Sequence, residues 1–307
     1  MTERLRIATR ESPLALWQTH HVADRLQRLH ADLQIELVPL TTRGDQILDR
    51  PLAQIGGKGL FLKELEQAML KGEADLAVHS CKDMPAELDD GMALCGLLDR
   101  ADPTDALVSP KHASLDELPN GARVGTSSLR RRAQLLALRP DLQILDLRGN
   151  VGTRLRKLDE GQYEAIVLAT AGLQRLGLDE RIRQRLQPPT FLPAPAQGVI
   201  ALECRAGDAR VMTLVQPLHD PLSAARAEAE RAFSRALAGS CDVPLAAYAE
   251  VIDGQLQLQG LVASADGQRS LRDQLGGSIE QPEALGLALA ERLLAAGAEA
   301  VLGRSAP

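Results

Sequence analysis

The stretch Arg123-Val124-Gly125-Thr126-Ser127-Ser128-Leu129-Arg130-Arg131-Arg132 passes from a short apolar strand, through three hydroxyl side chains, directly into a helix. We expect the strand at residues 123–125 and the helix at residues 128–138. Hydroxyl groups and free backbone amides at a helix start favour an anion, and nearby arginines add fixed positive charge. A capped helix with a solvated basic face is the alternative interpretation. A strand, a polar turn and a helix in this order form the repeating unit of α/β folds.

The same arrangement returns one unit later, in Leu147-Arg148-Gly149-Asn150-Val151-Gly152-Thr153-Arg154. Residues 123–157 contain nine basic and two acidic residues, a local charge of +7 in a chain whose net charge is −6. Two basic strand-to-helix turns in one domain are hard to explain as solvated faces. Guanidinium groups suit carboxylates or phosphates with bidentate geometry, so these turns indicate a site for such an anion.

Short apolar strands alternate with amphipathic helices through the first 200 residues or so, which predicts α/β units with largely parallel sheets. The expected strands are residues 6–9, 35–40, 75–78, 92–98, 123–125, 142–147, 165–169 and 199–202, and the expected helices are residues 14–29, 60–70, 128–138 and 151–158. The composition shifts near residues 100–103, and the proline-rich run at residues 188–195 suggests a hinge or return segment. We therefore expect a discontinuous first domain, residues 1–99 with 199–218, and a second domain at residues 104–193.

The last part of the chain has a different pattern. Asp253-Gly254 and Asp266-Gly267 are both typical of hairpin turns between short strands. Three antiparallel strands flanked by helices at residues 223–237 and 283–296 predict a small α+β domain at residues 221–307.

Composition restricts the classes of function. The 307 residues are 45% apolar and 25% charged, which is ordinary for a globular protein. A net charge of −6 and an aromatic content of 2% give no reason to expect nucleic acid or membrane binding. The N-terminus has no apolar signal region and no apolar run is long enough to span a membrane, so we expect a cytoplasmic protein. The four cysteines show no metal-like pairing, so reduced thiols and no metal are expected.

The first domain supplies further polar turns. His79-Ser80-Cys81-Lys82-Asp83-Met84-Pro85 follows a predicted strand and places Lys82 beside Asp83 at its carboxyl end. A surface ion pair is one interpretation; the other is that Asp83 transfers protons or stabilises a cation. His79 is more simply a hydrogen-bonded structural histidine than a base. Thr9-Arg10-Glu11-Ser12-Pro13 and Gly56-Gly57-Lys58-Gly59 add donors, although the latter lacks the spacing of a P-loop.

Cys241 lies in Leu237-Ala238-Gly239-Ser240-Cys241-Asp242-Val243-Pro244, after a predicted helix. Small residues and a proline end the helix there, so we expect Cys241 on an exposed loop. Unpaired cysteines are mostly buried, and an accessible thiol is where covalent chemistry can take place. An ordinary loop cysteine is the alternative.

Taken in order, these motifs resemble the porphobilinogen deaminase (hydroxymethylbilane synthase) family. The matching stretches are residues 6–18, 56–61, 79–85, 124–131, 147–155, 192–205 and 230–244, which cover nearly the whole chain. The resemblance implies two domains like those of type II periplasmic binding proteins and a third that carries the cofactor. It implies that four porphobilinogen molecules are joined head to tail with loss of ammonia, giving linear 1-hydroxymethylbilane for tetrapyrrole (haem) biosynthesis. It also implies a monomer, and a dipyrromethane primer held by a thioether to the cysteine that Cys241 matches.

The resemblance also assigns roles to individual residues. It makes Asp83 the catalytic residue. The cofactor-binding residues would be Cys241, Lys82, Ser80, Thr126, Ser127, Ser128, Arg130, Arg131, Arg148, Gly149 and Gly198. The substrate-binding residues would be Arg10, Ser12, Arg148, Arg154, Gln197, Lys58 and Phe61. Because each porphobilinogen carries an acetate and a propionate, a growing chain accumulates carboxylates that suit such donors.

Three positions depart from the family pattern. Gln54 stands where a second lysine is frequent, Thr104 where arginine is frequent, and Ser240 where glycine is frequent. Gln54 puts in doubt a basic contact from that loop. The competing hypothesis is a non-catalytic anion-binding protein of the periplasmic type, which the first two domains alone would allow.

Overall fold

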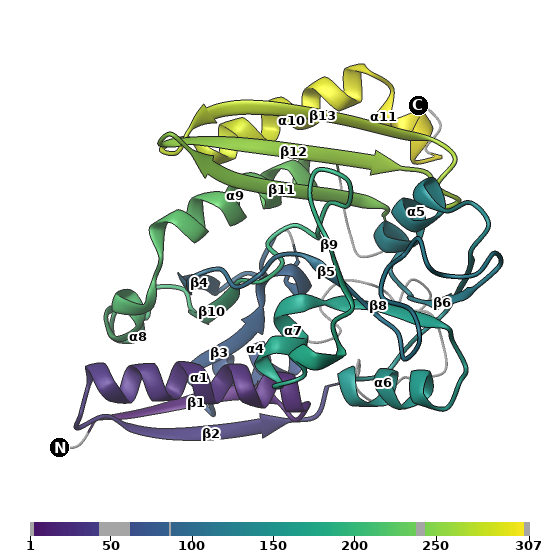
Figure 1. The fold of residues 1–307 in the computed structure, drawn as a ribbon. Coiled ribbons are helices and arrows are strands. Elements are labelled where there is room, and N and C mark those ends of the chain that lie inside the picture. Colours follow the sequence, from purple (N-terminus) through teal and green to yellow (C-terminus); the bar gives the residue numbers. More distant parts are fainter. Residues whose placement is uncertain (1–2, 43–61, 86, 238–242, 304–307) are drawn as a thin grey trace.

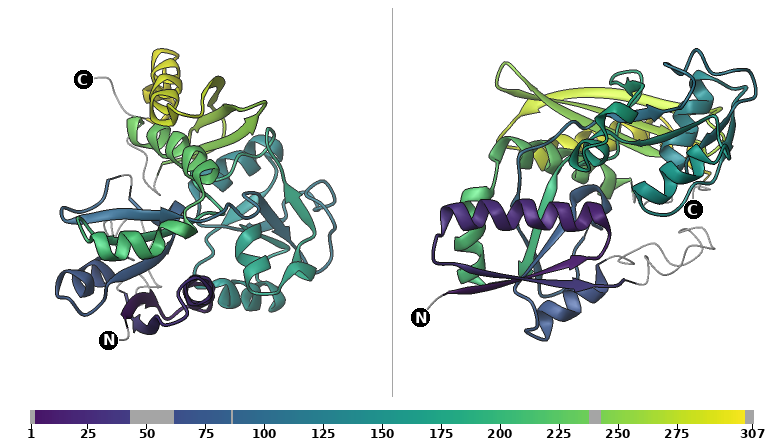
Figure 2. Two further views of the ribbon diagram at one scale, coloured as in Figure 1. Left: turned by 90° about the vertical axis from the view of Figure 1, so that its left-hand side faces the viewer. Right: turned by 60° about the horizontal axis from the view of Figure 1, so that its bottom comes forward.

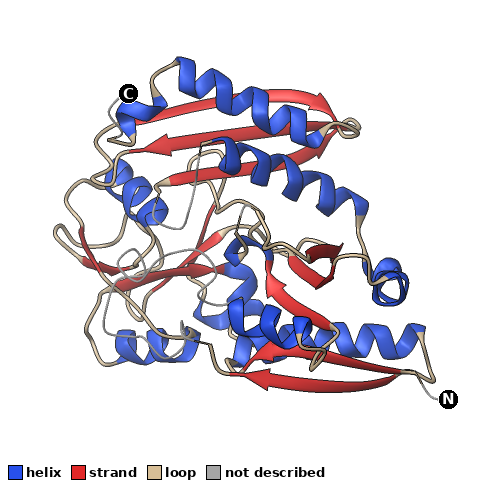
Figure 3. Ribbon diagram, turned by 180° about the vertical axis from the view of Figure 1, so that it is seen from behind, coloured by secondary structure: helices blue, strands red, loops and turns tan. Residues whose placement is uncertain are grey.

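The structure is a computed structural model that describes residues 3–42, 62–85, 87–237 and 243–303. Three β-sheets organise these residues, and Figure 1 shows them with the chain coloured from its N-terminus to its C-terminus. The first two sheets have five strands each and the third has three. Figure 3 shows the same molecule from behind, with the third sheet at the top and the first at the bottom.

The first sheet has the strand order β2-β1-β3-β10-β4. Its strands are β1 (Arg4–Arg10), β2 (Gln34–Leu40), β3 (Leu76–Ser80), β4 (Met92–Leu97) and β10 (Ile200–Arg205). Helices α1 (Pro13–Leu29) and α8 (Ala209–Val215) pack on one face, and α4 (Lys63–Leu70) packs on the other. Both faces are therefore covered, which is why β3 reads as an almost continuous apolar run.

The second sheet has the order β7-β6-β8-β5-β9. Its strands are β5 (Asp105–Val108), β6 (Arg123–Gly125), β7 (Gln143–Leu145), β8 (Ala165–Ala169) and β9 (Gln184–Leu186). Helix α5 (Leu129–Leu138) covers one face, while α6 (Val151–Asp159) and α7 (Thr170–Arg175) cover the other. The strand and helix expected on either side of Thr126 are confirmed.

The first two sheets are largely parallel, as expected, but each of them also contains one strand that runs against its neighbours. Strands β1, β2 and β3 are parallel, but β10 is antiparallel to β3 and β4. In the second sheet β5 is antiparallel to β8 and β9 in the same way. The reason is where the chain enters. Ile200 lies opposite Ser80 and Asp105 lies opposite Ala169, so β10 and β5 start beside the carboxyl ends of β3 and β8 and must run in the opposite direction.

Two segments join the first two sheets. Residues 98–104 lead from β4 to β5, and residues 187–199 lead from β9 back to β10. The composition shift and the proline-rich run of the sequence fall within these two crossing segments.

The third sheet has the order β11-β12-β13 and is antiparallel, as expected. Its strands are β11 (Leu245–Ile252), β12 (Gln255–Ala263) and β13 (Ser270–Ser278). Asp253-Gly254 forms the first hairpin turn with both φ angles positive, which a short β-hairpin favours. Helices α9 (Pro221–Ala236) and α10 (Pro282–Ala295) pack side by side on one face (Figure 2), and α11 (Ala298–Val301) follows.

Candidate functional site

The polar turns that follow β3, β6 and β7 come together from two different sheets. Arg154 interacts electrostatically with Asp83, Arg131 and Arg148. Lys82 interacts in the same way with Asp83, Arg130 and Arg131. We call these groups the cationic cluster, which consists of Lys82, Asp83, Asp105, Arg130, Arg131, Arg148 and Arg154.

Asp83 is presented by a single 3₁₀ turn, Cys81–Asp83, at the carboxyl end of β3. The Met84 amide closes this turn on the Cys81 carbonyl at 3.2 Å, and the buried Cys81 side chain anchors it in an apolar cluster. The Asp83 side chain is exposed, and within the described residues no hydrogen bond is made to its carboxylate. The turn therefore offers a free carboxylate at the edge where the strands end.

Lys82 points from the same turn into a more enclosed position. Its Nζ donates to Oε1 of Gln197 at 3.1 Å. Burial lowers the pKa of Lys82 to about 8, and the nearby guanidinium groups of Arg131 and Arg130 act in the same direction. The carboxylates of Asp83 and Asp105 raise the pKa of Lys82 but only partly offset burial and the two arginines. The negative charge around the ammonium group is therefore too small to restore its ordinary pKa.

Arg130 and Arg131 stand in the first turn of α5, where Ser128 caps the helix by accepting from the Arg131 amide at 3.4 Å. Both guanidinium groups are bound by Asp105, whose side chain is fully buried. Oδ2 accepts from Arg130 at 2.6 Å, and Oδ1 accepts twice from Arg131, at 3.0 and 2.6 Å. Burial by itself raises the pKa of Asp105, but the two arginines outweigh it and hold that pKa below its usual range.

This arrangement limits what the two arginines can offer a ligand. Arg131 also donates to the Val167 carbonyl at 2.9 Å, and Arg130 donates to the Leu192 carbonyl at 2.8 Å. Three of the five N–H directions of Arg131 are therefore used inside the protein. The pair contributes positive charge to the site and only part of its hydrogen-bonding capacity.

Arg154 lies on α6, one turn beyond Gly149. Its Nε donates to the Gly149 carbonyl at 2.7 Å, and Gly149 has a φ of +111°. Burial lowers the pKa of Arg154 to about 10, with Arg131 and Arg148 adding to the effect against the opposing Asp83. The cluster holds five cations and two carboxylates, a surplus of three positive charges.

The three hydroxyl residues after β6 organise the turn itself. Thr126 Oγ1 accepts from the Ser128 amide at 3.2 Å. Ser127 Oγ donates to the Leu147 carbonyl and accepts from its amide, both at 3.0 Å, which ties the turn to the residues that follow β7. Both interpretations of the sequence thus coexist here, because a capped helix lies directly against a surplus of positive charge.

The remaining predicted donors of the first sheet lie near the ends of β1 and β3. Ser12 caps α1 by accepting from the Ala15 amide at 3.4 Å. Ser80 accepts from Gln18 Nε2 at 2.9 Å. Arg10 is the last residue of β1 and is partly buried.

His79 is buried, and its Nε2 lies 2.9 Å from Oε2 of Glu203, so it has the hydrogen-bonded structural role that we expected.

Gln197 and Gly198 lie on the second crossing segment. Gly198 has a φ of +92°, and a Cβ there would come within 2.6 Å of the Ala101 carbonyl oxygen on the other crossing segment. Its own carbonyl accepts from Arg175 Nη2 at 2.7 Å. Glycine is required at this position because the two crossing segments touch backbone to backbone.

Several predicted residues cannot be assessed in the same way. Cys241, Lys58 and Phe61, and the departures at Gln54 and Ser240, lie outside the described residues. Thr104, the other departure, is buried and its Oγ1 donates to Asp102 Oδ1 at 2.6 Å.

The sequence interpretation missed Asp105, Arg100 and Glu230. Arg100 donates to both carboxylate oxygens of Glu230, at 2.6 and 3.1 Å, and both side chains are nearly inaccessible. A signal for Asp105 was available, since it precedes the apolar run of residues 106–108 that forms β5. Nothing local identifies its partners, which lie 25 and 26 residues further along the chain.

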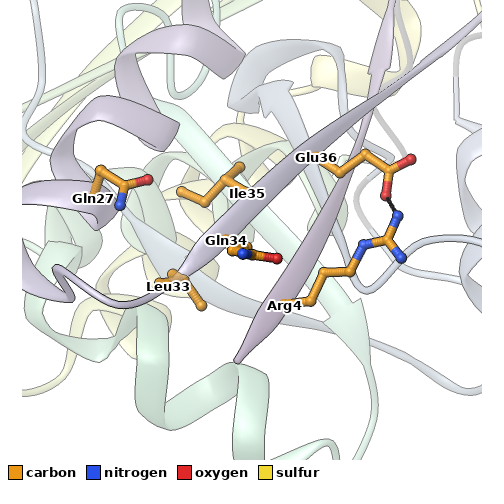
Figure 4. Close-up of a pocket in the computed structure, with 6 residues that line it drawn as sticks. All are labelled: Arg4, Gln27, Leu33, Gln34, Ile35 and Glu36. Atoms are coloured by element: carbon orange, nitrogen blue, oxygen red, sulfur yellow. Dashed lines mark hydrogen bonds and ion pairs between the residues drawn. The ribbon is translucent and has the colours of Figure 1, made fainter. Parts of the chain in front are cut away.

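Among the described residues, one surface hollow lies away from the cationic cluster. This hollow of about 480 Å³ is lined by Arg4, Gln34 and Glu36 among others (Figure 4). These residues stand at the amino ends of β1 and β2, opposite the edge that carries the cationic cluster. In the part of the chain that the structure covers, no group of acidic, histidine or cysteine side chains could hold a metal ion. No described helix is long and apolar enough to cross a membrane.

The architecture defines the class first. Two five-stranded sheets covered by helices and joined by two crossing segments, with polar turns at the strand ends, form two α/β units. A periplasmic substrate-binding protein of an ABC transporter from Coxiella burnetii is similar, with a TM-score of 0.44 and 16% identity over 72% of this chain and 94% of that one. The small antiparallel domain is additional to this arrangement.

Sequence comparison then gives the family. Residues 5–213 match the model of the porphobilinogen deaminase dipyrromethane cofactor-binding domain, and residues 224–295 match that of the porphobilinogen deaminase C-terminal domain. A porphobilinogen deaminase from Stenotrophomonas maltophilia is 63% identical over 98% of this chain and 99% of its own. One from Xanthomonas axonopodis is 60% identical over 97% and 98%. The chain belongs to the porphobilinogen deaminase family.

Proposed function

We propose that this chain joins four porphobilinogen molecules head to tail with loss of ammonia and releases linear 1-hydroxymethylbilane for tetrapyrrole (haem) biosynthesis. It is a transferase that works on a dipyrromethane primer. Family membership over nearly the whole chain supports the reaction. The observation that carries the location of the site is the surplus of positive charge in the cationic cluster. The competing hypothesis of a non-catalytic anion-binding protein is not favoured, because the match includes the third domain.

The donor set fits a dipyrromethane. Such a group brings two acetates and two propionates, whose negative charge would offset the surplus and favour the charged forms of Lys82 and Arg154. Lys82, Arg148 and Arg154 would bind these carboxylates, with Arg130, Arg131 and the polar groups near them completing the site. These further groups are Ser80, Thr126, Ser127, Ser128, Gly149 and Gly198. The bound group supplies a pyrrole carbon that is nucleophilic enough to attack the next substrate unit.

Asp83 is proposed as the catalytic group. Its carboxylate is exposed and stands beside the most positive part of the site. Loss of ammonia leaves an electrophilic substrate unit. Attack of a pyrrole carbon on this unit produces a pyrrole cation. A carboxylate close to the pyrrole nitrogens stabilises that charge and accepts or returns the proton.

The remaining assignments extend this proposal. Cys241 is the covalent anchor of the primer, and Arg10, Ser12, Lys58 and Phe61 contact the substrate. A cytoplasmic location and a monomeric state, with porphobilinogen as the small-molecule partner, belong to the same proposal.

Intact-mass measurement tests the proposed function. The purified protein should be heavier than its sequence by two linked pyrrole units, and Cys241→Ala should remove this extra mass together with the activity. Cys95→Ala, which changes a partly buried cysteine on β4, is the matched control and should keep both. Fully active protein with the unmodified mass would contradict the proposal.

A further inference from the structure

The side chain of Gln197 makes hydrogen bonds to groups on both sides of the site. It is 1% exposed and lies on the second crossing segment, three residues before β10 begins. Its Oε1 accepts from Lys82 Nζ at 3.1 Å. Its Nε2 donates to the Asp105 carboxylate at 3.0 Å and to the Pro103 carbonyl at 2.7 Å. One amide therefore bridges the first sheet, both crossing segments and the second sheet.

The two ends of this amide match the charges that they face. The carbonyl end faces the Lys82 ammonium, and the amino end faces the Asp105 carboxylate and backbone carbonyl oxygens. Among the described residues, Gln197 is the only hydrogen-bond acceptor of Lys82. Because the Lys82 ammonium group is buried, this acceptor both fixes the position of Lys82 and stabilises its charged form.

The bridge continues into the arginine pair. Asp105 is the carboxylate that fixes Arg130 and Arg131 at the start of α5. On the other side, Lys82 shares its short turn with Asp83. The backbone around Gln197 is also held, since its carbonyl accepts from Arg100 Nε at 2.9 Å. A shift of Gln197 would therefore move groups on both sheets relative to one another.

We infer that Gln197 is a positioning residue that holds Lys82 in register with the Asp105–Arg130–Arg131 group across the two crossing segments. Its side chain is engaged by the protein on both ends, and it acts on the ligand through Lys82. This inference rests on the proposed function, which places ligand carboxylates on Lys82 and the arginines. It explains how carboxylate-binding groups from two sheets keep a fixed separation although the chain between them consists of two irregular segments.

The first test is the pH dependence of kcat/KM for porphobilinogen, measured on the holoenzyme of Gln197→Met. Methionine is about as long as glutamine but has neither the carbonyl oxygen that accepts from Lys82 nor the amino group that donates to Asp105. We expect kcat/KM to fall about tenfold to a hundredfold, as for loss of hydrogen bonds to a charged group. The alkaline fall of the profile should move to lower pH, because Lys82 loses the acceptor that stabilises its charge. Gln187→Met, an exposed change on the same segment, is the control and should match the parent.

The second variant, Gln197→Glu, keeps an acceptor for Lys82 and adds a negative charge. The alkaline fall should then move to higher pH, opposite to the methionine variant, while repulsion from Asp105 lowers kcat/KM. The two substitutions thus make opposite predictions from one physical cause. Profiles that fall at the same pH as the parent in both variants would overturn the inference.

A double-mutant cycle with Lys82→Met separates this inference from the proposed function. If Gln197 acts through Lys82, Gln197→Met should cost far less in the Lys82→Met background than alone. Additive losses would overturn the positioning role and leave the proposed function intact. If Lys82→Met itself changed neither cofactor content nor kcat/KM, the site assignment in the proposed function would fail instead.

Discussion

Asp105 shows how a single buried residue shapes the site. A fully buried carboxylate is costly unless it is paired, and here two guanidinium groups and one amide surround it. Two cations bound by one anion leave a charge of +1 in the interior. That residual charge contributes to the depressed pKa of Lys82 and makes the site receptive to further carboxylates.

Asp83→Asn tests the assignment of the catalytic carboxylate. The substitution keeps the size of the side chain and removes its negative charge, so folding and cofactor content should be retained. Turnover of porphobilinogen should fall by about a hundredfold or more, the range for a positioned acid–base group. Absorbance of the bilane product and the intact mass would measure the two quantities.

The control for this change is Asp90→Asn, which alters an exposed aspartate seven positions along the chain. It should leave both turnover and mass unchanged. Near-normal turnover in Asp83→Asn would remove Asp83 from the catalytic role.

At the scale of elements, α4 meets the first sheet through a buried carboxyl group. Glu66 of α4 faces Glu203 of β10. Glu203 is fully buried, and no hydrogen bond to its Oε1 is present among the described residues. Burial raises the pKa of Glu66 to about 7, and the charges of Glu203 and Asp89 add to the effect. A proton on Glu66 can be donated to Glu203, which satisfies the buried oxygen.

This geometry predicts a pH dependence of stability. A carboxyl group whose pKa is higher in the folded state binds more protons there, so the free energy of unfolding falls as pH rises from about 4.5 to about 7. Glu66→Gln should remove this slope, because the amide cannot lose a proton. Denaturant unfolding at several pH values measures it, with the exposed Glu73→Gln as the control. The same slope in Glu66→Gln and the parent would show that Glu66 does not titrate in this way.

Strong local patterns identified most elements correctly. Helix α1 and strands β6 and β8 agree with the expected ranges to within a residue, because periodicity and turn chemistry are local. Strands β5 and β9 were missed. They have four and three residues and pair with strands far along the chain, so the local signal of each is too short to identify a strand by itself.

At the scale of the whole molecule, the third domain is joined to both crossing segments through Glu230. Its Oε1 accepts from Nη1 of Arg100 on the first crossing segment at 2.6 Å. Its Oε2 accepts from the Ala196 amide on the second crossing segment, also at 2.6 Å. The carboxylate also accepts from the Ala249 amide of β11 at 2.6 Å. Arg272 of β13 donates to the Thr190 carbonyl at 3.0 Å, which adds a second junction. The third domain therefore rests on both crossing segments.

Glu230→Gln should destabilise the protein strongly. Removing the carboxylate leaves Arg100 buried without a counter-charge, and breaking such a buried pair costs about 3–5 kcal/mol. Chemical denaturation would measure the change. Glu228→Gln, an exposed position on the same helix, should have little effect. Equal stabilities of the two variants would show that the pair does not hold the domains together.

The sequence by itself determined most of the local elements, the strand-to-helix turns that carry charge, the hairpin domain and the family. These features follow from periodicity, turn chemistry and ordered motifs, which are all properties of neighbouring residues. Only the tertiary structure decided how the charges are shared. It pairs Arg130 and Arg131 with Asp105, engages Gln197 between Lys82 and Asp105, and joins Glu230 to both crossing segments. The physical reason is that the effect of a charge depends on its burial and its partners, and both come from residues distant in the chain.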